Sequence, residues 1–102
     1  MYDVDEEGFL EDPGSWSEDF ARQVATAEDL TLTESHWELI EQTRSFHAEY
    51  GFSPSMRPLV KYIAGNLGPE KGKSIYLMTL FPPSPARLLS KLAGLHKPKN
   101  CL

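Results

Sequence analysis

The sequence predicts a mostly α-helical fold: a compact domain of about five helices, with a small N-terminal β-hairpin and a flexible C-terminal arm. Three observations predict it. The 102 residues, 40% of them hydrophobic, suit one small domain with a modest core. Several segments repeat apolar residues at helical spacing between capping and stop residues. The last eight residues lack any such pattern. We therefore expect a helical domain over residues 1–94 and a mobile arm over residues 95–102.

The N-terminal hairpin and the first helix rest on short local signals. Residues 5–10 place a turn signal before two apolar residues, which favours a hairpin. Either Ser15 or Ser17 is a suitable N-cap for a helix that ends near Ala27. Its inner side would carry Phe20, Val24 and Ala27.

The second and third helices are defined more clearly. Thr33 is a suitable N-cap for the second helix, and Gly51 supplies its stop. A cap at residues 53–54 begins the third, whose apolar stripe runs to Gly68. Pro58 lacks a backbone donor, so this helix either begins late or is kinked there.

Two short helices complete the domain. Residues 74–81 form an apolar segment that ends at a pair of prolines. Residues 84–85 cap the last helix, which Gly94 ends. Its inner side carries Leu88, Leu89 and Leu92.

The composition excludes several classes of protein. No apolar run is long enough to span a membrane, and the acidic N-terminus resembles neither a signal nor a transit peptide, so we expect a cytoplasmic protein. The single cysteine, Cys101, excludes an internal disulfide framework and a cysteine-based zinc site. His36 and His47 lie three helical turns apart and do not form a shared metal site. We expect neither a metal nor a cofactor.

Charge is divided along the chain. There are 14 acidic and 2 basic residues up to Tyr50, but 1 acidic and 8 basic residues from Gly51 onward. A helix-turn-helix around Gly51 would direct Arg57 and Lys61 toward DNA. The acidic helix before it would repel phosphates, and we expect no direct nucleic-acid binding. The basic half either is a solvated surface or attracts an anionic partner.

The position of Cys101 suits transfer chemistry, because a thiol on an extended tail reaches both a donor and an acceptor. The thiolate is the nucleophile. Lys97 and Lys99 favour it, whereas the nearby C-terminal carboxylate opposes it, so the sign of the pKa shift stays open. A stray exposed thiol is the alternative. His96 is a weaker candidate for a general base, since no acid orients it.

Several motifs in order give the chain a resemblance to the DsrC/TusE/DsvC family of sulfur-transfer proteins. The matching stretches are residues 5–10, 16–19, 36–38, 53–57, 59–61, 68–72, 76–77 and 80–82, then Ala93-Gly94-Leu95, Lys97-Pro98 and the penultimate Cys101. The resemblance implies a persulfide on Cys101. Members that serve sulfite reductase carry a second arm cysteine where this chain has Ser90, so an internal thiol–disulfide cycle is not expected. His96 stands where the family usually has proline, which would loosen the arm.

The resemblance predicts a sulfur carrier of the single-cysteine, TusE-like branch, which relays sulfane sulfur toward 2-thiouridine at the tRNA wobble position. Its partners would be an upstream persulfide donor and a downstream sulfur-accepting enzyme. Arg57, Lys97 and Lys99 would dock a partner or stabilise the anionic sulfur. Such a protein is a protein substrate rather than an autonomous enzyme. The alternatives are a partner of dissimilatory sulfite reductase or another sulfur-oxidation complex, and a helix-turn-helix regulator.

Overall fold

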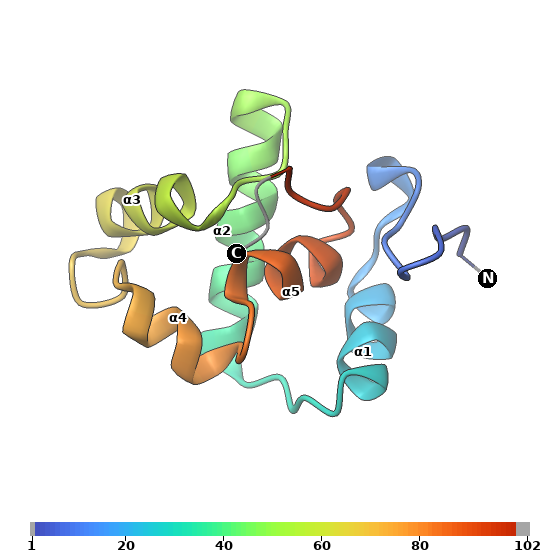
Figure 1. Cartoon of the computed structure of the whole chain (residues 1–102), viewed down its shortest axis with the longest axis horizontal. Coiled ribbons are helices and arrows are strands. Elements are labelled where there is room, and N and C mark those ends of the chain that lie inside the picture. The colour runs from blue at the N-terminus through green and yellow to red at the C-terminus, as the bar shows by residue number, and fades with distance from the viewer. Residues whose placement is uncertain (1, 100–102) are drawn as a thin grey trace.

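The last α-helix is the centre of the fold. A computed structural model describes residues 2–99 and shows α5 packed against each of the other four α-helices, while α2 also packs against α3 (Figure 1). The elements are a 3₁₀ turn η1 (Pro13–Ser15), α1 (Glu18–Ala27), α2 (Glu34–Tyr50), α3 (Met56–Leu67), α4 (Ser74–Leu80) and α5 (Pro85–Leu92). The expected set of five helices is therefore confirmed.

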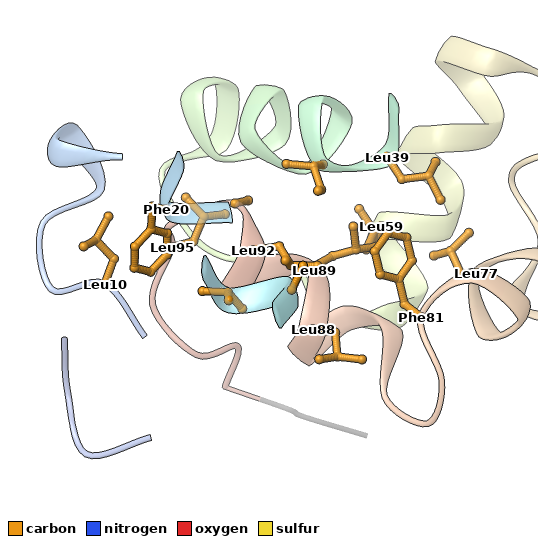
Figure 2. Close-up of a cluster of buried hydrophobic side chains, with 14 of the residues drawn as sticks. Leu10, Phe20, Leu39, Leu59, Leu77, Phe81, Leu88, Leu89, Leu92 and Leu95 are labelled. Atoms are coloured by element: carbon orange, nitrogen blue, oxygen red, sulfur yellow. The ribbon is translucent and has the colours of Figure 1, made fainter. Parts of the chain in front are cut away.

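Apolar side chains of α5 form the middle of the core. Leu88, Leu89 and Leu92 lie between two groups of buried side chains (Figure 2). The group contributed by α2, α3, α4 and the residue after α4 comprises Leu39, Leu59, Leu77 and Phe81, and the group on the other side comprises Leu10, Phe20 and Leu95. A buried leucine or phenylalanine contributes about 1.5–3 kcal/mol relative to an exposed one. The core thus holds α5, and with it the start of the C-terminal segment, in place.

The helix ends follow the local signals with small shifts. Ser17 caps α1, because its hydroxyl accepts a hydrogen bond from the Phe20 amide at 3.2 Å. Gly51 ends α2 in the left-handed conformation, with φ of 83°. The α3 cap is Ser55, two residues later than expected, which places Pro58 in the first turn. A proline in the first turn removes no helical hydrogen bond. Of the two predicted alternatives, a late start and a kink, the structure therefore shows the late start.

One residue predicted on the inner side of α1 is not buried. The last residue of α1, Ala27, is exposed, whereas Ala21 and Ala25 are buried beside Phe20 and Val24. The apolar side of α1 therefore follows helical spacing from Phe20 but ends at Ala25, two residues before the end of the helix.

The predicted N-terminal β-hairpin is not supported. Within residues 2–99 there is no β-strand, and a single antiparallel bridge joins Val4 to Leu10. The Asp5 carboxylate accepts hydrogen bonds from the Glu7 and Phe9 amides, both at 2.9 Å, which closes the turn locally. Because side-chain acceptors satisfy these amides and no third strand lies alongside, the segment forms a turn rather than a ladder.

The buried histidine of α2 has a structural role. His36 Nδ1 accepts hydrogen bonds from the Thr33 amide at 3.1 Å and the Thr33 hydroxyl at 2.8 Å. Nε2 is then the protonated nitrogen and donates to the Leu80 carbonyl at 2.9 Å. His36 therefore ties the start of α2 to the end of α4.

Candidate site at the base of the C-terminal segment

The end of α5 directs the chain toward the C-terminus. Gly94 adopts φ of 73°, and its amide donates to the Lys91 carbonyl at 3.2 Å. The Leu95 amide donates to the Ser90 carbonyl at 2.9 Å, and the Leu95 side chain is buried. This pair of hydrogen bonds with an apolar residue after the glycine is a Schellman motif. It fixes the direction in which residues 96–99 leave the domain.

Two side chains cover the last carbonyls of α5. Trp16 Nε1 donates to the Leu92 carbonyl and Arg44 donates to the Ala93 carbonyl, each at 2.8 Å. The Arg44 guanidinium also lies 4.1 Å from the centre of the Trp16 ring, a cation–π distance. Partial burial lowers the pKa of Arg44 from its ordinary value. The positive charge stabilises the negative end of the α5 dipole.

His96 is held from two sides. Its carbonyl accepts a hydrogen bond from the Ser53 hydroxyl at 2.5 Å, and its Nε2–H donates to the Glu11 carbonyl at 2.7 Å. These contacts join the segment to the turn after α2 and to the N-terminal region. The prediction that His96 loosens the arm stays a prediction, although the His96 carbonyl and side chain are both hydrogen-bonded here.

The next residues continue along the same surface. Lys97 Nζ lies 3.1 and 3.2 Å from the two carboxylate oxygens of Glu7, and Pro98 is buried. The exposed side chains of Lys97 and Lys99 thus flank a buried proline. The domain boundary at residue 95 and the mobility of the arm stay predictions.

A pocket of about 540 Å³ lies between this segment and the turn that joins α2 to α3. Its lining side chains are mostly basic or hydroxyl-bearing, with one aromatic wall. They are His47, Phe52, Ser53, Ser55, His96, Lys97 and Lys99, and Gly51 completes the rim.

The structure brings together only part of the predicted site. Lys97 and Lys99 line the pocket, whereas the exposed Arg57 of α3 does not. Cys101 lies outside the described residues. At about 3.3–3.6 Å per residue, its Cα is at most about 7 Å from that of Lys99.

Sequence reasoning missed the other half of the pocket. The sequence pattern singles out His47 only as a metal-ligand candidate that its spacing from His36 rules out, and Ser53 as a helix cap within one of the family-like stretches. Ser53 and His96 are 43 positions apart, so no local pattern connects them. The glycine turn at Gly51 was the one local signal that pointed to these residues, because it reverses the chain beside the pocket.

Ser90 lies inside α5 rather than on the C-terminal segment. Its side chain is fully buried, and its hydroxyl has no hydrogen-bond partner among residues 2–99. A buried hydroxyl without a partner costs about 1–3 kcal/mol. The site therefore suits a less polar side chain better than serine.

Within residues 2–99, no helix is both long and apolar enough to cross a membrane. No cluster of three or more histidine, cysteine, aspartate or glutamate side chains in this range has the arrangement to hold a metal ion.

Comparison with known proteins identifies relatives that match nearly the whole chain. The sulfurtransferase TusE homolog of Haemophilus influenzae is 48% identical over 100 residues, covering 98% of this chain and 92% of the relative. Sulfurtransferase TusE of Escherichia coli K12 is 43% identical over 100 residues, with 98% and 92% covered.

Solved structures give the same result for the fold. Allochromatium vinosum DsrC superposes with a TM-score of 0.89 at 42% identity, covering 99% of this chain and 90% of that one. The oxidized gamma-subunit of dissimilatory sulfite reductase (DsrC) from Archaeoglobus fulgidus gives 0.82 at 35% identity, with 99% and 92% covered. The family model described as DsrC like protein matches residues 1–102, and the chain therefore belongs to the DsrC-like family.

Proposed function

We propose that this protein is a sulfur carrier that receives sulfane sulfur as a persulfide on Cys101 and passes it to an acceptor protein. The observation that carries the proposal is the position of the single cysteine, two residues beyond Lys99 at the rim of the basic pocket. The TusE and DsrC relatives support a role in sulfur transfer.

The chemistry is thiol exchange in two steps. The Cys101 thiolate attacks the outer sulfur of a donor persulfide, so that the donor S–S bond breaks and the donor leaves as a thiolate. The sulfur now attached to Cys101 is then attacked by an acceptor thiolate, and the Cys101 thiolate is regenerated. The exchange conserves electrons, so it needs no external oxidant.

The three predicted basic residues would have different roles. Lys99 forms no ion pair with any of residues 2–99, and we assign it to stabilising the anionic sulfur. Lys97 is partly neutralised by Glu7, which reduces its contribution. Arg57, exposed outside the pocket, would instead contact a docked partner.

Intact mass spectrometry tests the proposal directly. The protein is incubated with a low-molecular-weight persulfide donor, freed of excess donor and measured beside Cys101→Ser. We expect one added sulfur atom on the wild type and none on the variant. An unmodified wild type, or equal addition to the variant, would show that Cys101 does not carry sulfur.

The relay that this carrier would serve is the finer part of the proposal. Its TusE relatives and the serine at position 90 favour a relay toward tRNA wobble thiolation. The DsrC structures favour, as the second candidate, a partner of dissimilatory sulfite reductase. Purification of the tagged chain from its native cells separates the two, because the bound proteins would be either a tRNA thiolase or the reductase.

A further inference from the structure

We infer that the pocket beside the C-terminal segment binds a small, doubly charged oxyanion. The inference goes beyond the proposed function, because it requires no sulfur on Cys101. The first observation is that the lining of this pocket is basic, whereas the chain as a whole is acidic. Acidic residues outnumber lysine and arginine by 15 to 10 overall, yet no carboxylate is among the described residues that line this pocket.

The lining supplies several donors. Lys99 provides an ammonium group without an ion pair to any of residues 2–99, Lys97 provides one that is shared with the Glu7 carboxylate, and His47 provides a ring nitrogen. The His96 Nε2–H is already donated to the Glu11 carbonyl. Ser55 lines the pocket at the N-cap of α3, and within residues 2–99 its hydroxyl makes no capping hydrogen bond. Oxyanions are bound in proteins by such combinations of ammonium groups, hydroxyls and helix N-termini.

The wall that carries the lysines is held in place before any ligand binds. Pro98 is buried between Lys97 and Lys99, and His96 is hydrogen-bonded to Glu11 and Ser53. The opposite wall is fixed by the left-handed turn at Gly51. The backbone next to the lysines is therefore anchored at His96 and Pro98, which lowers the cost of ordering it when a ligand binds.

The pocket is large enough for a small ligand and its water. A volume of about 540 Å³ admits an inorganic anion together with water, and the exposed Phe52 closes one side with an apolar surface. Phosphate and sulfite share the size, charge and acceptor geometry that these donors match.

Titrations followed by amide NMR shifts test the inference on Cys101→Ser, in which the thiol cannot react. Sodium phosphate, sodium sulfite and, as a control, sodium chloride are added at matched ionic strength and mildly alkaline pH. We expect saturable shifts at Gly51, Ser53 and Ser55 with the dianions. Lys99→Ala should weaken binding about two- to fivefold, as for other exposed charge contacts. Lys73→Ala, outside the pocket, should leave it unchanged.

Saturation by both dianions supports a general oxyanion site, and saturation by only one supports a site selective for that anion. Equal shifts with chloride, no saturation, or a Lys99→Ala variant that binds like the wild type would overturn the inference. Because Cys101 is absent from the tested protein, this failure is distinct from failure to form a persulfide.

Discussion

Replacing Gly94 by alanine tests whether the end of α5 is built as described. Gly94 has φ of +73°, where an L-residue costs about 1–2 kcal/mol more than glycine. A Cβ there would also lie 2.4, 2.8 and 2.9 Å from Cδ1, Cγ and Cβ of Trp16. Overpacking of this kind typically costs about 1–3 kcal/mol. Gly94→Ala should therefore lower the free energy of unfolding by about 2–5 kcal/mol.

The same substitution at Gly65 provides the matched control. Gly65 lies within α3, and a Cβ there would meet no atom within 4 Å. Alanine should stabilise this helix by about 0.5–1 kcal/mol. Circular dichroism during thermal and urea unfolding measures both variants. We expect Gly94→Ala to lower Tm by about 10–30 °C, whereas Gly65→Ala raises it slightly. If Gly94→Ala unfolded like the wild type, the packing of Trp16 against this turn would be refuted.

Three other substitutions test separate contacts. Ser90→Ala should raise the free energy of unfolding by about 1 kcal/mol, because it removes a buried hydroxyl without a partner; a lower value in urea titrations would contradict this assignment. His96→Ala should lower the NMR order parameters of residues 96–99 relative to the wild type, and unchanged values would show that His96 does not restrain the segment. His36→Ala should cost about 2–4 kcal/mol, because the Thr33 amide and the Leu80 carbonyl lose their partner, and a loss below 1 kcal/mol in the same titrations would argue against the tie between α2 and α4.

Local signals predicted the helices well because each acts within a few residues. The Ser17 cap, the Gly51 stop and the Ser84-Pro85 start all lie where the sequence indicated. The hairpin prediction failed because a turn signal at Gly8 specifies a reversal of the chain and not the pairing partners that extend a ladder. The effect of Pro58 on the third helix could not be predicted for a related reason. A proline is tolerated in the first turn but kinks a helix further along, so its effect depends on where the helix begins.

The candidate site was less predictable because it is assembled from distant segments. The C-terminal cysteine and its flanking lysines were evident from their order in the chain. The contacts of His96 with Ser53 and Glu11, and the placement of His47, depend on how α2 packs against α5. Ser90 illustrates the same limit: the sequence placed it within the last helix, but only the packing shows that its hydroxyl is fully buried.

Release of sulfur from Cys101 tests the central claim most directly, because a carrier must both accept sulfur and give it up. The loaded protein, freed of donor, is treated with cyanide, which removes sulfane sulfur as thiocyanate. We expect one thiocyanate per chain, with return of the intact mass to that of the untreated protein, and none from Cys101→Ser treated in the same way. Equal thiocyanate from the variant, or sulfur that stays on the wild type, would contradict the account.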